Sequence, residues 1–309
     1  MSDSPPSLRH VPGLLGRFAP YYLRHFATAP FRHRDSLREA IAHPVRRHQI
    51  AVYDAVMELL LKGYAELAGH RLRRETGTVA VMLSRIGFAF DDEYERREAA
   101  GESLTFEEVF QSPAVALRLE QWRELMREHA SYGTIREFLY EFVTSLYKSY
   151  RDTTSETARR SYEALMRSAV IDSGGLLVTL AHVIARLHGS VPTENVINQF
   201  SSLGVTAKLA DDLVDLRTDL AGGRPNLVQA LAFERPAEQA RIADALSQGK
   251  RMHAGWWAAQ CPGVYEQITG TYEEHQAVLT SRWLRFASRL MWTPVLFGHG
   301  RAVETRGRL

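Results

Sequence analysis

The sequence has a single cysteine, Cys261, in 309 residues. One cysteine cannot close a disulfide within the chain and cannot supply a cysteine-based zinc site. The opening residues, MSDSPPSLRHVPG, contain an acid and three prolines but no apolar stretch of the kind that a signal peptide needs. No run approaches about 18 consecutive apolar residues, so we expect no stable membrane insertion and a cytoplasmic location.

The sequence also lacks an excess of either charge. It holds 38 basic and 36 acidic residues, for a net charge of +2. Such a balance does not favour a nucleic-acid partner, which usually requires a clearly basic domain. Apolar residues make up 45% of the chain, an ordinary value for a globular protein, and the length is ample for one large core.

Helical periodicity covers the chain from about residue 13 onward, and no segment alternates as a half-buried strand does. We therefore expect one all-α domain of about ten helices over residues 13–300, between a flexible leader at 1–12 and a tail at 301–309. In the helix predicted at 193–221, Thr193 is a suitable N-cap and Gly222 a stop signal. The longer expected helices lie at 46–72, 77–99, 113–130, 134–151, 155–188 (interrupted by Gly174 and Gly175), 193–221, 236–259 and 263–291, with a short one near 105–111.

The richest chemical signal lies between Gly204 and Val228, where several aspartates share one helix. At 100° per residue, Asp211, Asp215 and Asp219 fall within about 80° and span about 12 Å of the helix axis. Like charges four residues apart destabilise an isolated helix. Divalent cations such as Mg²⁺ bind carboxylate oxygens and share them with phosphates. The pattern therefore predicts a Mg²⁺–diphosphate site.

A second acidic cluster, Asp91, Asp92 and Glu95, follows an apolar stretch that ends near Phe88. Asp91 and Glu95 are four residues apart and share a helical face. Taken alone, this segment is equally compatible with a solvated helix end, since charge runs usually face water. Its occurrence together with the first cluster favours a pair of acidic helices.

The two motifs, DDxxE at 91–95 and DDxxDxxxD at 211–219, resemble those of the class I isoprenoid synthase superfamily. The second is similar to the (N/D)Dxx(S/T/D)xxx(E/D) motif of bacterial terpene cyclases, with Asp in place of the usual Asn, Ser and Glu. The resemblance implies an α-helical barrel whose two acidic helices bind several Mg²⁺ ions, with Mn²⁺ as an alternative. The implied metal ligands are Asp91, Asp92, Glu95, Asp211, Asp215 and Asp219.

The same resemblance implies a reaction. A terpene synthase, a carbon–oxygen lyase, ionises a linear prenyl diphosphate such as farnesyl or geranylgeranyl diphosphate to an allylic cation. It then releases a terpene product and diphosphate. Phe88, one turn before Asp91, would present a π face to that cation.

Further positions are implied by the cyclase pattern. Arg167 matches an arginine that senses the diphosphate, and Gly174 matches a helix break whose carbonyl faces the substrate. Arg282, followed by Trp283, stands where cyclases often have an Arg-Tyr pair. Arg167 and Arg282 are equally compatible with plain surface arginines. Lys208 and Arg224, on either side of the second motif, are alternative ligands of the diphosphate.

Two other functions stay open. Squalene and phytoene synthases, prenyltransferases that couple two prenyl diphosphates head to head, have a block that this chain also resembles. Lys208 stands there where glutamine is usual. A non-catalytic helical protein with two acidic patches is the third reading. A homodimer is common among similar proteins and is an expected partner state. The residues that match the coupling block are Leu203, Gly204, Leu209, Leu213, Asp215, Asp219, Gly223 and Arg224.

Overall fold

The computed structural model describes residues 5–32, 44–102, 105–153 and 159–298. Every regular element within these ranges is a helix, and none is a strand, so the all-α prediction is confirmed. The expected tail at 301–309 lies outside the described residues. The elements are η1 (Leu8–His10), α1 (Val11–Arg32), α3 (Pro44–Ala68), α4 (Arg74–Ala99), α5 (Phe106–Phe110), α6 (Pro113–Met126), α7 (Tyr132–Thr153), α9 (Tyr162–Ala169), η2 (Val170–Gly174), α10 (Gly175–Leu187), α11 (Glu194–Ala221), α12 (Leu227–Phe233), α13 (Pro236–Ser247), α14 (Ala254–Gln260), α15 (Pro262–Val278), α16 (Arg282–Met291) and α17 (Thr293–Phe297).

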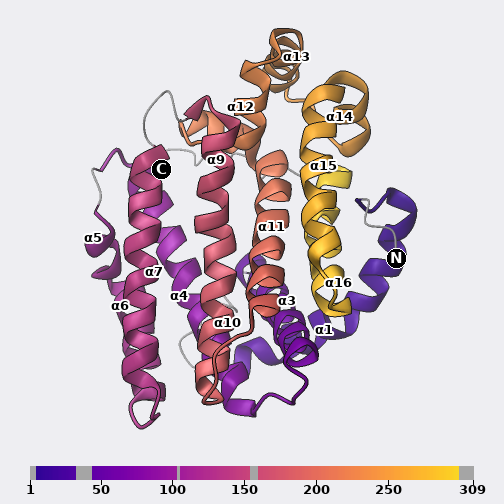
Figure 1. The fold of residues 1–309 in the computed structure, drawn as a ribbon. Helices are drawn as coiled ribbons and strands as arrows, with labels where there is room; N and C mark the ends of the chain where they lie inside the picture. Colours follow the sequence, from indigo (N-terminus) through magenta and orange to yellow (C-terminus); the bar gives the residue numbers. More distant parts are fainter. Residues whose placement is uncertain (1–4, 33–43, 103–104, 154–158, 299–309) are drawn as a thin grey trace.

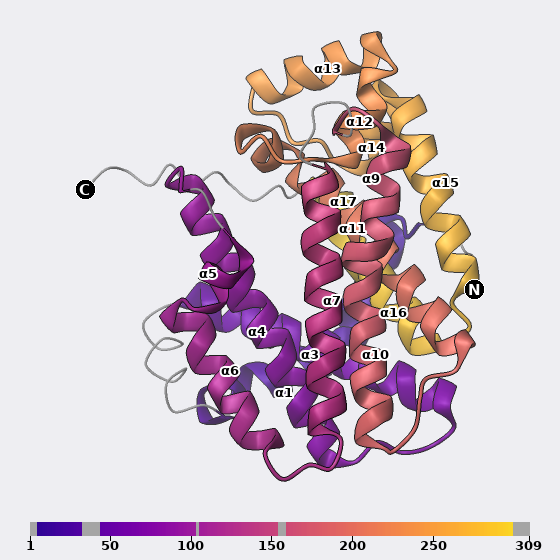
Figure 2. The ribbon, with the colours of Figure 1, turned by 60° about the vertical axis from the view of Figure 1, so that its left-hand side comes forward.

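Helix α11 occupies the middle of the bundle. It packs against α10 and η2 on one side and against α15 and α16 on the other, and Figures 1 and 2 show it between these helices. The predicted helix at 193–221 is confirmed with its ends. Thr193 caps the start by accepting a hydrogen bond from the Val196 N–H, and Gly222 is the C-cap.

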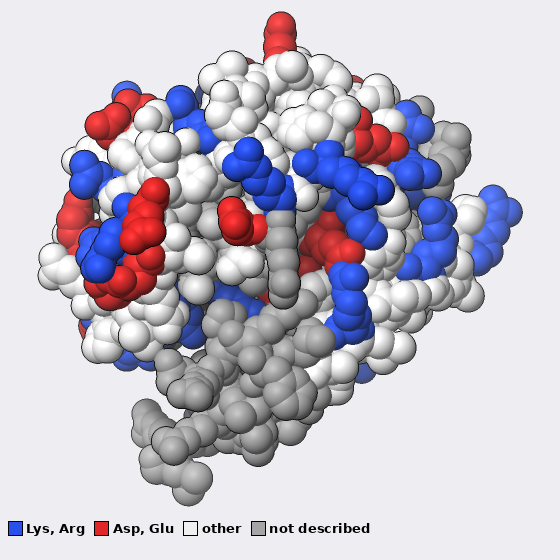
Figure 3. All heavy atoms as spheres, turned by 90° about the horizontal axis from the view of Figure 1, so that it is seen from below, with Lys and Arg blue, Asp and Glu red and all other residues white. Residues whose placement is uncertain are grey.

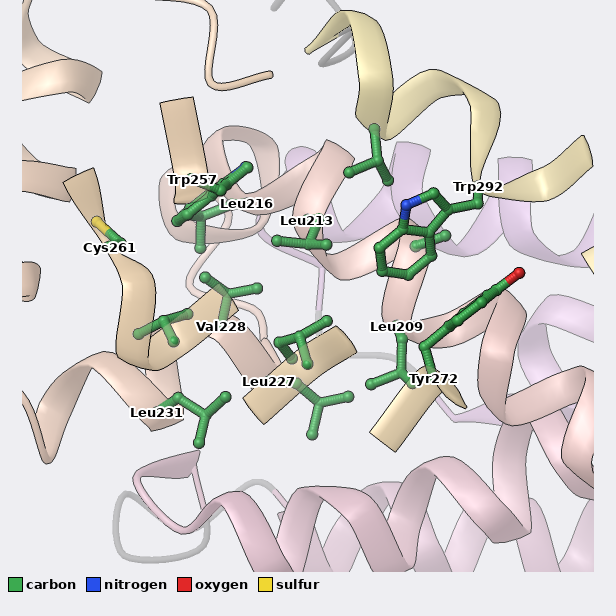
Figure 4. Close-up of a cluster of buried hydrophobic side chains, with 14 of the residues drawn as sticks. Leu209, Leu213, Leu216, Leu227, Val228, Leu231, Trp257, Cys261, Tyr272 and Trp292 are labelled. Atoms are coloured by element: carbon green, nitrogen blue, oxygen red, sulfur yellow. The ribbon is translucent and has the colours of Figure 1, made fainter. Parts of the chain in front are cut away.

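One hydrophobic cluster joins α11 to the α12–α17 layer. In Figure 4, Leu216 lies beside Trp257, Leu213 lies near Leu227, and Leu209 lies beside Tyr272. Fully burying a side chain of this size stabilises a fold by about 1.5–3 kcal/mol. These leucines alternate with the aspartates along α11, which explains how a helix with four acids can stay inside the bundle.

Helix α10 takes part in two further clusters. Its residues Leu180 and Ile184 pack in a cluster with α3, α11 and α16. Its residues Val183 and Leu187 pack in another cluster with α4, α6 and α7. Residues three or four apart lie on one face of a helix, so α10 uses different faces for the two clusters and lies between α4 and α11.

Three predicted helices are divided in the structure. The segment 155–188, which was expected to be interrupted at Gly174 and Gly175, contains the π-helical turn η2 at Val170–Gly174. The segment 236–259 forms α13 and α14, and 263–291 forms α15 and α16. The turn between α15 and α16 is stabilised by a residue that is distant in sequence. Gln199 Oε1 accepts hydrogen bonds from the N–H groups of Thr280 (2.8 Å) and Ser281 (3.1 Å).

The structure bears on two further expectations, the leader at the start of the chain and the absence of membrane insertion. Residues 8–10 form η1 and α1 begins at Val11, so regular structure starts inside the segment 1–12 that was expected to be a leader. Within the described part of the chain, Tyr162–Leu187 is long and apolar enough to cross a membrane by length and composition alone, and one such helix does not contradict the expectation of no membrane insertion. The core helix of a soluble protein can have the same composition, and α10 is buried against both of its neighbours.

The buried thiol of Cys261 gives a first prediction. Burial raises the pKa of this thiol to about 11, and its residue is fully buried. Because the thiolate is the reactive form, the folded protein should resist iodoacetamide at pH 8, whereas the urea-unfolded chain should be alkylated promptly. Mass spectrometry of both samples checks this, and rapid alkylation of the folded protein would contradict it.

Candidate functional site

The four aspartates of α11 differ in their surroundings. Asp212 is fully buried, Asp215 and Asp219 are 8% and 7% exposed, and Asp211 lies at the surface. Asp211 and Asp212 are neighbours in sequence, but a 100° step around the helix turns them in different directions. The predicted stripe therefore runs from an exposed carboxylate at Asp211 to a buried one at Asp219.

Asp212 fastens α11 to the next helix. Its Oδ2 accepts a hydrogen bond of 2.7 Å from the Leu227 N–H at the start of α12, and its Oδ1 lies 2.7 Å from Lys208 Nζ. Asn226 completes the junction, because its side chain donates to the Asp212 carbonyl oxygen and caps the first N–H groups of α12. The second aspartate of the DD pair is thus structural.

Asp219 is also engaged by its neighbours. Its Oδ1 accepts from Arg224 Nε at 3.0 Å and its Oδ2 from Asn226 Nδ2 at 2.8 Å. These bonds hold the turn at Gly222 and Gly223, where Gly223 has a φ of +64° that favours glycine. Asp219 and Arg224 were expected to bind metal and diphosphate respectively, but here they bind each other.

Asp211 is the carboxylate best placed to receive a cation. It is exposed, and within the described residues no hydrogen bond or ion pair to it is found. Asp215 lies one turn further along the same face of α11 and is mostly buried. These two acids remain suitable ligands for a hard divalent ion, whose preferred donors are carboxylate oxygens.

The π-helical turn η2 lies directly against α11. A Cβ added to Gly204 would stand 2.1 Å from the Ser173 carbonyl oxygen, so this contact requires glycine. Gly174 is buried and faces Ser201 in the same way, with 3.0 Å from its Cβ position to Ser201 Oγ. Short π-helical turns are frequently found at functional sites, and this one contains the expected break at Gly174.

Asp172, in the middle of η2, is a site residue that the sequence patterns missed. Burial raises the pKa of its carboxyl, Lys208 lowers it and Asp211 raises it again, so all three groups lie within electrostatic reach of one another. Burial acts to lower the pKa of the Lys208 ammonium, but Asp212 and Asp211 outweigh it and the pKa is raised. A lysine among three carboxylates is therefore the electrostatic centre of this region.

The ion pair between Lys208 and Asp212 is charged at neutral pH. Burial raises the pKa of Asp212 to about 6, against the opposing influence of Lys208 and of the Leu227 N–H. That value is below 7, and the ammonium at 2.7 Å stays protonated. Asp212 would be neutralised only in mildly acidic solution, while Lys208 keeps its charge.

The first acidic motif lies on α4, but the side chains of Phe88, Asp91, Asp92 and Glu95 lie outside the described part of the structure. The backbone of α4 fixes their level in the bundle. Helix α4 and helix α11 begin at the same end, because Thr76 near the start of α4 lies 3.0 Å from Nε2 of His188, just before α11. Asp91 follows Arg74 by 17 residues, and Asp211 follows Glu194 by 17 residues. Both motifs therefore start about 25 Å along their helices.

Arg167 and Arg282, the two candidate arginines far from α11 in sequence, lie in different places. Arg167 is on α9, exposed, and pairs at 2.9 Å with Glu163. Arg282 is 73% exposed at the start of α16 and lies 3.4 Å from Glu66. The neighbouring Ser281 is bonded to Gln199, which is 12 residues or about 18 Å before Asp211 on α11. The structure thus does not bring Arg282 to the acidic segment.

Within the described residues, no group of three or more His, Cys, Asp or Glu side chains is arranged to hold a metal ion. The side chains of Asp91, Asp92 and Glu95 are not among those residues, so the described part contains only one side of the expected site. A comparison with protein-family models finds no match, and a comparison with curated protein sequences finds none either.

The contact at Gly204 predicts a large effect of a single methyl group. Gly204→Ala should lower the free energy of unfolding by about 3 kcal/mol, because the new Cβ meets the backbone of η2. Gly270→Ala is the matched control in α15, where nothing lies within 4 Å. It should stabilise the protein by about 0.5–1 kcal/mol. Urea unfolding followed by circular dichroism measures the free energy of unfolding of both variants. Equal changes in the two variants would contradict the close contact at Gly204.

The different surroundings of neighbouring aspartates predict different mutational costs. Asp212→Asn should destabilise the protein by about 2 kcal/mol, because it leaves the Lys208 ammonium without its partner. The loss is smaller than for a fully buried pair, since the Lys208 side chain is 26% exposed. Asp211→Asn should change stability by no more than about 0.5 kcal/mol. Urea unfolding at pH 7 tests the pair, and a larger cost for Asp211→Asn would refute the assignment.

Proposed function

We propose that this protein is a Mg²⁺-dependent class I terpene synthase that acts on a linear prenyl diphosphate, such as farnesyl or geranylgeranyl diphosphate. The observation that carries the proposal is the common level of the two acidic motifs. Both begin about 25 Å along helices that start at the same end of the bundle. Both helices also pack against α10. Two unrelated acidic surface patches would not be expected to lie at the same distance from one end of the bundle.

The residues present fit a diphosphate–metal site in part. Asp211 offers an exposed carboxylate and Asp215 a second one on the same face, and α4 would add Asp91, Asp92 and Glu95. Asp219 would have to share oxygens already bonded to Arg224 and Asn226. Bound Mg²⁺ would neutralise the diphosphate and favour its departure as a leaving group.

The cations of the chain itself would complete the neutralisation. Lys208 is held at the site by Asp212. Arg167 is held only by an ion pair in which both partners are mostly exposed, with 66% exposure for the arginine. Such a surface pair contributes little to stability, so Arg167 is available to turn towards a diphosphate. Arg282 is left out of this role because it lies at another level of the bundle.

An apolar surface next to these charges supports a prenyl substrate. Val170 and Ile171 of η2 are 43% and 44% exposed, and Leu176 at the start of α10 is 52% exposed. Adjacent exposed apolar side chains commonly mark a binding surface. On α7, the Phe142 ring lies 3.1 Å from the Cβ position of Gly175, and Phe138 contacts the His182 ring with centroids 4.5 Å apart. Phe142 thus lies against the turn at Gly175, and Phe138 lies against α10 about two turns further on.

A product assay separates the proposal from its alternatives. The purified chain is incubated with C10 to C20 prenyl diphosphates and Mg²⁺, and the products are identified by mass. Cyclic or branched terpenes with released diphosphate support a terpene synthase. Products with a doubled carbon skeleton would instead indicate coupling of the squalene and phytoene type. Failure to release diphosphate in a Mg²⁺-dependent manner would refute both enzymatic functions.

The carboxylates of α11 predict a graded response to Mg²⁺. Asp215→Ser should retain activity but require more Mg²⁺, because a neutral oxygen replaces a charged one. Asp211→Ala should abolish activity while leaving the fold intact, because its side chain is exposed. Asp244→Ala, which removes an exposed acid from α13, is the control and should behave as the unmodified protein. Diphosphate release is measured against Mg²⁺ concentration, and normal turnover by Asp211→Ala would refute the metal assignment.

A further inference from the structure

A polar hollow lies at the opposite end of the bundle from the acidic motifs. It has a volume of about 330 Å³ and is lined by the start of α7, the end of α10 and the segment that leads into α11. Its position at the start of α11 places it about 25 Å along the helix from Asp211. That distance separates it from the proposed diphosphate site. The residues that line it are Ser131, Thr134, Arg186, Gly189, Ser190 and Val191.

Arg186 supplies the charge of this hollow. The residue is only partly buried. Within the described residues no hydrogen bond or ion pair of its guanidinium is found, and the Nε atom is buried without a partner. The pKa of His182 is lowered mainly by burial and in addition by the positive charge of Arg186. A buried donor without an acceptor costs about 1–3 kcal/mol, and more when it is charged. An arginine in this state therefore favours a negatively charged ligand.

The start of α7 adds donors on another side of the hollow. The N–H of Tyr132 bonds to the His129 carbonyl and that of Ile135 bonds to the Ser131 carbonyl. In the part of the chain that the structure describes, the N–H groups of Gly133 and Thr134 between them have no acceptor. The first N–H groups of a long helix attract phosphate groups, and the exposed hydroxyl of Thr134 is a further donor.

The surroundings do not repel an anion. The lining, all of it in the described part of the chain, includes no aspartate or glutamate. Figure 3 shows the lower face, on which basic side chains are interspersed with acidic ones and no continuous acidic field is formed. The volume is at the small end of the range for small-molecule sites, about 300–1,000 Å³. It admits a phosphate group with few further atoms.

We propose that this hollow binds a phosphate group, held by the Arg186 guanidinium, the Thr134 hydroxyl and the free N–H groups of Gly133 and Thr134. An arginine guanidinium and the N–H groups at a helix start would donate hydrogen bonds from different directions. The tetrahedral oxygens of a phosphate can accept from both sets of donors, whereas the two coplanar oxygens of a carboxylate ligand can accept from fewer of them. The site does not depend on the proposed terpene synthase activity or on Mg²⁺.

Calorimetric titration of the full-length protein with inorganic phosphate tests this proposal. The buffer contains no Mg²⁺, and sodium chloride at the same ionic strength is the reference titrant. Phosphate should bind where chloride does not. Arg186→Gln should weaken phosphate binding tenfold or more, as expected for the loss of a charged hydrogen-bonding group. Thr134→Val should weaken it about threefold to tenfold.

Arg123→Gln is the matched control, because it removes one positive charge from an exposed ion pair on α6. It should leave phosphate binding unchanged. An equal loss in Arg123→Gln and Arg186→Gln would overturn the proposal, since it would indicate general charge screening. Binding of phosphate no stronger than that of chloride would overturn it as well. If circular dichroism shows that Arg186→Gln does not fold, unchanged affinity in Thr134→Val would be decisive against the site.

Discussion

The close backbone contact between α11 and η2 is the constraint on which the rest of this structure depends. Gly204 allows the Ser173 carbonyl to approach to a distance that no side chain would permit. Because helices packed so closely cannot shift, this contact fixes the level of η2 against α11. It thereby brings Asp172 beside Lys208 and Asp211, and it places exposed apolar residues of η2 and α10 next to that charged group.

The aspartates of α11 divide into structural and available groups because of their angles around the helix. Asp212 and Asp219 hold the junction with α12 through Leu227, Asn226 and Arg224. Asp211 lies at the surface. A motif read as a uniform row of ligands thus includes residues that stabilise the fold. Buried charges are tolerated when they are paired and hydrogen-bonded, and this junction satisfies both conditions.

Much of the architecture could be predicted from the sequence, because it depends on local rules. Apolar residues at helical spacing predicted an all-α chain, and the cap at Thr193 and the stop at Gly222 lie where expected. The divisions within 236–259 and 263–291 could not be predicted in the same way. The turn between α15 and α16 depends on Gln199, which is about 80 residues away in sequence. The start of α15 is likewise capped by Glu238, whose carboxylate accepts from the Gly263 and Val264 N–H groups.

In the candidate site as well, features set within one helix could be predicted, and features set by packing between distant helices could not. The sequence by itself determined that α11 is a helix and that Asp211 and Asp215 share one of its faces, because the helical period fixes angles between near neighbours. Only the tertiary structure decided which of the acids is exposed, that Asp172 belongs with them and with Lys208, and that Arg282 lies at another level. These outcomes depend on which surfaces of distant helices meet, and a helical period within one segment contains no information about its partners.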